Sequence, residues 1–141
     1  MTQAERHRLV AELLREDWDD IPLDFPWTPA LVAEIDRLHA AGDDHALADP
    51  SMHFAAFGLD LLARADGATL DERAEESLVA DLLRSWFDDP PATPQLVADV
   101  RRQWQLEGDR GVMHDATRGY ALFGLRLLAR VATEARLRRS S

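Results

Sequence analysis

The hydrophobic residues of this chain recur at helical spacing, and three strings of them occur twice in the same order. The pairs are LVAELLR at 9–15 with LVADLLR at 78–84, TPALVAEI at 28–35 with TPQLVADV at 93–100, and FGLDLLARA at 57–65 with FGLRLLARV at 123–131. Matched positions are 69, 65 and 66 residues apart, respectively. Nothing alternates as a half-buried strand would.

This pattern predicts an all-α fold, a six-helix bundle built from two tandem three-helix repeats with pseudo-twofold symmetry. A length of 141 residues suits one domain. We therefore expect a single domain over 1–141, with internal repeat units of approximately 1–66 and 67–138.

Capping signals predict where the helices begin and end. Thr2 with Glu5 and Thr69 with Glu72 match the capping box, in which a threonine and a glutamate satisfy each other's backbone amides. The other starts are predicted at Thr28-Pro29, Asp49-Pro50, Thr93-Pro94 and Asp115. Glycines 42, 67 and 108 stand where helices can end in a left-handed residue.

Two glycines lie inside predicted helices, where each costs about 1 kcal/mol relative to alanine. They are Gly58 and Gly124, at matched positions in the two FGL strings. A glycine kept twice suggests a close approach of two backbones, so we expect the third and sixth helices to cross there. The next matched pair, Asp60 and Arg126, has opposite charges that would form a salt bridge across such a crossing.

The composition is that of a globular protein, with 46% hydrophobic and 30% charged residues. Cysteine is absent, which excludes disulfides and thiolate chemistry. The N-terminus lacks the apolar run of a signal peptide, and no apolar stretch approaches the ~18 residues of a membrane span, so we expect a cytoplasmic protein. All sixteen basic residues are arginine and asparagine is missing, a bias typical of GC-rich bacterial genes.

The net charge of −10 is concentrated in the first half. Residues 1–66 hold 14 Asp or Glu against 5 Arg, whereas residues 67–141 hold 12 against 11. Such a field repels nucleic acid and attracts a basic partner to the first half. Solubility alone would also explain an acidic chain.

An aromatic insertion follows the first predicted helix, where the linker is four residues longer than its counterpart. It reads IPLDFPW before Thr28, whereas the second linker reads PPA before Thr93. Tryptophan on a proline-stiffened loop is typical of interface hot spots. The predicted partner-binding residues are Asp19, Asp20, Asp24, Phe25 and Trp27. Alternatively, Trp27 folds onto Val32 as a hydrophobic staple and the aspartates form turns or pair with arginines.

A second reading places a small-molecule site in the cleft between the repeats. Its predicted lining is Trp18, His53, Phe54, Trp86, Asp88, His114 and Tyr120. A cofactor-free enzyme would use His53 or His114 with an aspartate in the same cleft.

His39, His45 and His53 lie near Asp43, Asp44 and Asp49, a grouping that could bind a metal or exchange protons. Their counterparts at matched positions are Trp104, Gly111 and Gly119, so we expect surface or capping histidines. The sequence holds no HExxH, GxSxG or phosphate-loop motif.

The sequence therefore favours a non-catalytic acidic helical protein that binds a basic protein partner, as inhibitors, immunity factors and adaptors do. The alternatives are a small-molecule binder and a cofactor-free enzyme. We expect no catalytic residue, cofactor, metal, nucleic-acid or membrane partner, and a monomer or homodimer.

Overall fold

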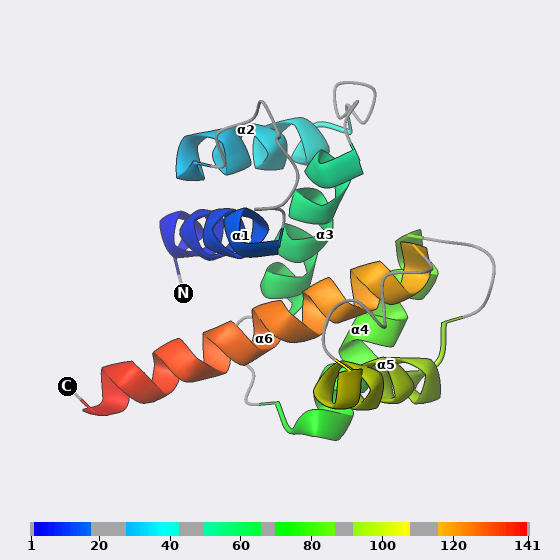
Figure 1. Cartoon of the computed structure of the whole chain (residues 1–141). Coiled ribbons are helices and arrows are strands. Elements are labelled where there is room, and N and C mark those ends of the chain that lie inside the picture. Colours follow the sequence, from blue (N-terminus) through cyan, green and yellow to red (C-terminus); the bar gives the residue numbers. More distant parts are fainter. Residues whose placement is uncertain are drawn as a thin grey trace. The chain divides into compact units, whose positions relative to one another are not determined.

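Six α-helices make up the computed structural model, which describes residues 2–17, 28–42, 50–65, 70–86, 92–107 and 116–140 (Figure 1). The helices are α1 (Gln3–Asp17), α2 (Pro29–Ala40), α3 (Pro50–Ala65), α4 (Glu72–Trp86), α5 (Pro94–Glu107) and α6 (Ala116–Ser140). No strand occurs in these ranges. The predicted all-α class and the six helices are confirmed.

Threonine caps open three of the helices. The hydroxyls of Thr2, Thr28 and Thr93 each accept a hydrogen bond from the backbone N–H three residues further on, at 3.2, 3.2 and 3.1 Å. Each bond satisfies one of the amides that an α-helix leaves without an internal partner at its N-terminus. These three predicted starts are confirmed. Helix α3 begins at Pro50 as predicted, while Asp49 and Asp115 lie outside the described residues.

The predicted capping box of the fourth helix is wrong. Helix α4 begins at Glu72, and its cap is Asp71, whose Oδ1 accepts a hydrogen bond of 2.8 Å from the Ala74 N–H. Asp71 lies 69 residues after Thr2, the same offset that relates LVADLLR to LVAELLR. Thr69 lies only 67 residues after Thr2, so a cap there would stand two residues too early relative to LVADLLR.

The ends of the helices follow the glycine signals. Helix α2 ends at Ala40, and Gly42 adopts a φ of 76°, the left-handed conformation that only glycine reaches without strain. Its N–H donates to the carbonyl of His39 at 3.0 Å. Helices α3 and α5 end at Ala65 and Glu107, directly before the predicted stops, whose glycines are outside the described residues.

The chain divides into two compact units, Met1–Leu62 and Ala63–Ser141. In the first unit α1 packs against α2, and α3 is joined to α2 by a polar contact. Its core on α1 and α2 consists of aliphatic and small residues, and Phe57 on α3 is buried as well. The fully buried members on α1 and α2 are Leu9, Val10, Ala11, Leu13, Leu14, Val32 and Ile35.

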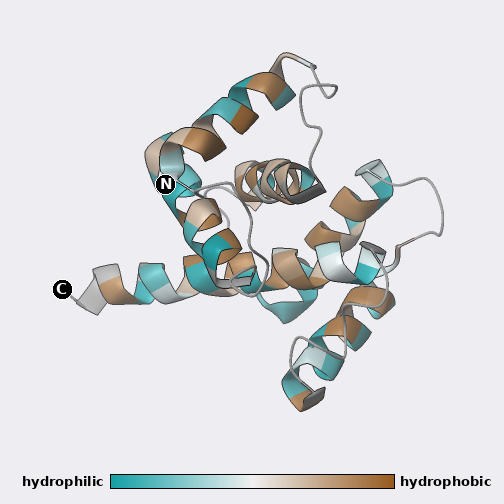
Figure 2. Cartoon of the chain, turned by 45° about the horizontal axis from the view of Figure 1, so that its top comes forward, coloured by the Kyte–Doolittle hydropathy of each residue, from teal (hydrophilic) through white to brown (hydrophobic). Residues whose placement is uncertain are grey.

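The second unit contains α4, α5 and α6, and each of these helices contacts the other two. Its core on α4 and α5 comprises Val79, Ala80, Leu82, Leu83, Val97 and Val100. Hydrophobic and hydrophilic residues are interspersed along each helix, as expected for helices with one buried face (Figure 2).

Both interior glycines are buried, Gly58 on α3 and Gly124 on α6. Their flanking phenylalanines, Phe57 and Phe123, are buried too, with 0% and 3% of their surface exposed. A solvent-facing glycine would have contradicted the expected close approach, and neither faces solvent. The crossing of α3 with α6, the Asp60–Arg126 pair and the single domain stay predictions.

Candidate functional site

The predicted partner-binding segment falls outside the described residues. Asp19, Asp20, Asp24, Phe25 and Trp27 all lie between α1 and α2, in the range 18–27. The staple of Trp27 on Val32 is therefore a prediction as well. Val32, its proposed partner, is fully buried in the core of the first unit.

Two histidine–aspartate contacts tie the first unit together through α2. Nε2 of His7 on α1 lies 2.9 Å from Oδ2 of Asp36 on α2, and Nε2 of His39 on α2 lies 3.1 Å from Oδ2 of Asp60 on α3. All four side chains are partly buried. Asp60 thus bonds to His39 within its own unit. The predicted grouping of His39 with Asp43, Asp44 and Asp49 involves aspartates outside the described residues.

A denser cluster joins α4 to α5 in the second unit. Arg101 on α5 donates from Nη2 to Glu75 Oε1 at 2.9 Å and from Nη1 to Glu76 Oε1 at 3.0 Å. Glu72 Oε2 lies 3.8 Å from Nη1. Only 12% of the Arg101 side chain is exposed, with 17% and 16% for Glu75 and Glu76. One guanidinium therefore serves three carboxylates, two of them largely removed from water.

Burial leaves a mark on the titration of this cluster. Desolvation raises the pKa of Glu75 above its ordinary value of 4.5, and the charge and hydrogen bond of Arg101 offset only part of that rise. The negative charges of Glu72 and Glu76 add to the increase in its pKa. The environment of Glu75 therefore disfavours its charged form, because the site is desolvated and contains more carboxylates than cations.

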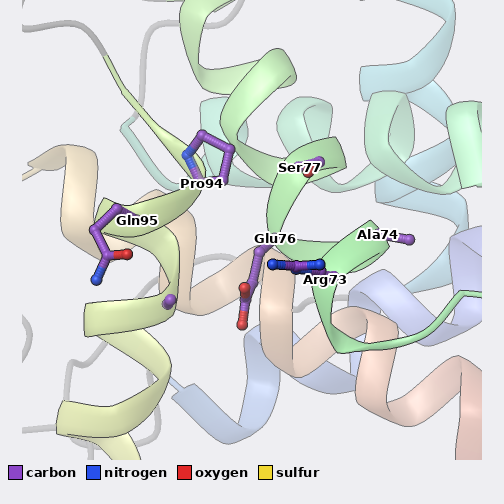
Figure 3. Close-up of a pocket in the computed structure, with 7 residues that line it drawn as sticks. Arg73, Ala74, Glu76, Ser77, Pro94 and Gln95 are labelled. Carbon is purple, nitrogen blue, oxygen red and sulfur yellow. The ribbon is translucent and has the colours of Figure 1, made fainter.

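A shallow groove runs beside this cluster, between the first turns of α4 and α5 (Figure 3). Its volume is about 360 Å³. It is lined by Arg73, Ala74, Glu76, Ser77, Pro94, Gln95 and Ala98. None of these residues belongs to the predicted ligand-binding set, so the groove is a different feature from the predicted cleft.

The structure brings together two residues of the predicted ligand-binding set, Trp86 on α4 and Tyr120 on α6. Their ring centroids are 6.4 Å apart and the planes are inclined by 43°, a common packing geometry for aromatic pairs. Burial raises the pKa of Tyr120 above its ordinary value of 10.0. Such a contact is as typical of a packed helical core as it is of a ligand-binding site.

The other predicted ligand residues are not gathered around this pair within one unit. His53 and Phe54 lie half-buried on α3, in the first unit. Trp18, Asp88 and His114 lie outside the described residues. The cleft between the repeats and its lining therefore stay a prediction.

Metal binding, membrane spans and similarity to known proteins each bear on the function of this chain. Within the described residues no three His, Asp or Glu side chains are grouped so that they could hold a metal ion. Among the helices in these ranges, none combines the length and apolar character needed to cross a bilayer. Comparisons of the chain with known protein families, curated proteins and solved structures gave no match.

Sequence reasoning missed the interhelical ion pairs. Arg101 is one of sixteen arginines, and none of the repeated strings contains His7. A signal was available, because Glu72, Glu75 and Glu76 are spaced three and four residues apart and so share one face of α4. Three acids on one helical face call for a cation from a neighbouring helix.

Proposed function

We propose that this chain is a non-catalytic acidic helical protein that binds a basic protein partner through its first half. It would act as inhibitors, immunity factors and adaptors do, by covering a cationic surface. The observation that carries the proposal is that the described acids of the first unit have partners on the helices, whereas its sequence has further aspartates in segments that contain no arginine.

The acids of this unit whose side chains are described lie on the helices. Where the side chains of α1 to α3 are described, each acid contacts a neighbouring side chain. The pairs are Glu5 with Thr2, Glu12 with Arg8, Glu34 with Arg37, Asp36 with His7 and Asp60 with His39. These carboxylates already have partners inside the unit.

Two short segments of the sequence between the helices are rich in aspartate. Residues 18–27 contain Asp19, Asp20 and Asp24, and residues 43–49 contain Asp43, Asp44 and Asp49. Neither segment contains an arginine. A concentration of like charge with no arginine among it favours binding to a cationic surface and speeds its association, provided that apolar residues lie beside it to make the contact specific. Segment 18–27 also carries Phe25 and Trp27, which would supply the apolar anchors that most interfaces need.

The proposal predicts a salt-sensitive complex that depends on one segment and not on the other. The tagged protein is used to capture partners from host lysate at low and high salt, and the captured protein is identified by mass spectrometry and purified. Its affinity is then measured against Asp19→Asn/Asp20→Asn/Asp24→Asn. The control is Asp43→Asn/Asp44→Asn/Asp49→Asn, which removes the same charge from the other segment.

We expect the first triple variant to bind at least about 10-fold more weakly, a loss of about 1.4 kcal/mol, while the control binds nearly as the unmodified protein does. Phe25→Ala/Trp27→Ala should weaken binding at high salt too, because apolar contacts are not screened. Equal affinities for all the variants, at both salt concentrations, would refute the proposal.

We propose also that the fold is a duplicated three-helix unit. The support is that residues at matched positions are buried alike, in most cases with the same residue type. Val10 and Val79 are fully buried, as are Leu13 and Leu82 at 1% and 0% exposure. On the third helices the buried run Ala55, Ala56, Phe57, Leu59, Leu61 and Leu62 corresponds to Ala121, Leu122, Phe123, Leu125, Leu127 and Leu128.

A further inference from the structure

The first two helices of each unit have nearly interchangeable cores. Helix α1, which packs against α2, contains LVAELLR, and α4, which packs against α5, contains LVADLLR. On the opposing helices Val32 and Ile35 correspond to Val97 and Val100, and all four are buried. Since the apolar faces are so similar, the core alone would accept α1 against α5, or α4 against α2, at little cost in packing.

The polar contacts beside these cores are inverted, because the acidic residue is on the second helix in one unit and on the first helix in the other. In the first unit the acid is on the second helix, where Asp36 of α2 meets His7 of α1 at 2.9 Å. At the matched positions the second unit has Glu76 on α4 and Arg101 on α5, which meet at 3.0 Å. The neighbouring position is inverted as well, because Arg6 corresponds to Glu75.

We infer that this inversion directs each helix to the partner in its own unit. Helix α1 placed on α5 would set Arg6 and His7 against Arg101. Helix α4 placed on α2 would set Glu75 and Glu76 against Asp36. Each mispairing replaces a part-buried attraction by a repulsion, and desolvation makes like charges more costly there than on an open surface.

The contact between α2 and α3 discriminates in the same way. His39 bonds to Asp60 at 3.1 Å, whereas the matched residues of α5 and α6 are Trp104 and Arg126. Helix α3 placed on α5 would put Asp60 beside an indole in place of its histidine. Helix α2 placed on α6 would put His39 beside Arg126. Both wrong pairings lose the bond that the correct pairing forms.

Such a device matters when matched helices are exposed together, during folding of one chain or between two copies of it. Duplicated units are prone to misassembly and to exchange of equivalent elements. The inversion would keep refolding chains from pairing with one another through their matched helices. This inference goes beyond the partner-binding proposal and does not depend on it.

The test removes the inversion while keeping an ion pair in both units. The variant Arg6→Glu/His7→Glu/Asp36→Arg gives the first unit the glutamates and arginine of the second, so correct and wrong pairings become equally attractive. The control adds Glu75→Arg/Glu76→His/Arg101→Asp, which exchanges the two sets and restores the inversion with opposite sign. The two variants carry the same substitutions in the first unit, so any direct effect of those changes on its stability is common to both.

Each protein is unfolded in urea and refolded over a range of protein concentrations. Its products are measured by size-exclusion chromatography with light scattering and its rates by tryptophan fluorescence. We expect the three-substitution variant to form at least about twice the wild-type fraction of dimer and larger species, rising with concentration, or to gain a slow refolding phase. The six-substitution control should refold as the wild type does.

Identical products and rates for all three proteins would overturn the inference, and so would a control that misassembles as much as the three-substitution variant. If Arg6→Glu/His7→Glu/Asp36→Arg does not fold, the reciprocal variant Glu75→Arg/Glu76→His/Arg101→Asp replaces it. That variant also equalises the two units and is read against the same six-substitution control.

Discussion

Arg101 Nη2 donates a hydrogen bond to Glu75 Oε1 over 2.9 Å, and this contact joins α5 to α4 away from most of the solvent. The same guanidinium reaches Glu76 at 3.0 Å. Its planar fork suits two carboxylates at once, which a lysine could not serve with the same geometry. The second unit is therefore held partly by one residue whose loss leaves two carboxylates unpaired.

We expect Arg101→Met to lower the free energy of unfolding by about 2–3 kcal/mol, because it strands Glu75 and Glu76 in a desolvated site. The neighbouring residue supplies the control. Arg102 is 69% exposed and pairs with Asp99 one turn earlier, so Arg102→Met should cost less than about 0.5 kcal/mol. Urea unfolding followed by circular dichroism measures both. Equal losses for the two variants would contradict the structural role assigned to Arg101.

The titration of Glu75 gives a prediction with a definite sign. Its pKa is raised in the folded protein, mainly by desolvation, so the folded state holds the proton more tightly than the unfolded chain does. The stability that Glu75 contributes is thus fully present below its ordinary pKa of 4.5 and is lost as the pH rises through the higher folded pKa. Glu75→Gln cannot titrate and should lack this loss.

The measurement is the difference in unfolding free energy between Glu75→Gln and the wild type, taken from pH 4.5 to neutral pH. We expect this difference to move in favour of the variant as the pH rises. Glu72→Gln is the control, because the Glu72 side chain is 80% exposed and lies farther from Arg101. A difference that moves in favour of the wild type would show that attraction to Arg101 outweighs desolvation.

The cap of α4 can be tested by comparing two positions. Asp71→Ala should lower the free energy of unfolding by about 1 kcal/mol, because it removes the acceptor of the Ala74 N–H, whereas Asp71→Ser keeps a cap and should recover most of that loss. Thermal unfolding of these variants and of Thr69→Ala provides the comparison. A larger loss for Thr69→Ala than for Asp71→Ala would favour the capping box suggested by the sequence.

The helices could be predicted because their signals are local. Thr28-Pro29 and Thr93-Pro94 each combine a cap with a residue that suits the first helical position, and both helices begin there. Burial of Leu13 and Leu14 followed from spacing alone. The error at Thr69 arose because two cap-like residues stand two positions apart. The offset of 69 that aligns LVADLLR with LVAELLR also aligns Asp71, and not Thr69, with the cap residue Thr2. That alignment is the only sequence feature that distinguishes the two candidate caps.

The interhelical contacts could not be predicted in the same way. Pairing His7 with Asp36, or Arg101 with Glu75, requires the rotation of each helix about its axis and the angle between helices. His7 corresponds to Glu76 through the offset of 69 between the first helices, and Asp36 corresponds to Arg101 through the offset of 65 between the second helices. Neither correspondence lies within one of the repeated strings. Of the candidate ligand residues, Trp86 and Tyr120 meet because α4 packs against α6, a contact between helices that are distant in sequence.

The buried glycines allow the expected crossing of α3 with α6 to be tested. Alanine at an open helical position would stabilise the fold by about 1 kcal/mol through helix propensity. A methyl group at a close crossing would instead cost about 1–3 kcal/mol through overpacking. Because Gly58 and Gly124 are both buried, we expect Gly58→Ala and Gly124→Ala each to destabilise the protein. Urea unfolding of both single variants and of the double variant measures the effect.

The double variant decides whether the two glycines meet. If they lie against each other, the first methyl group already forces the helices apart, so the second adds little and the losses combine to less than their sum by about 0.5 kcal/mol or more. If each glycine faces a helix of its own unit, the losses add. A stabilised single variant would show that no backbone or side chain approaches that glycine, and the crossing would then have no support from either position.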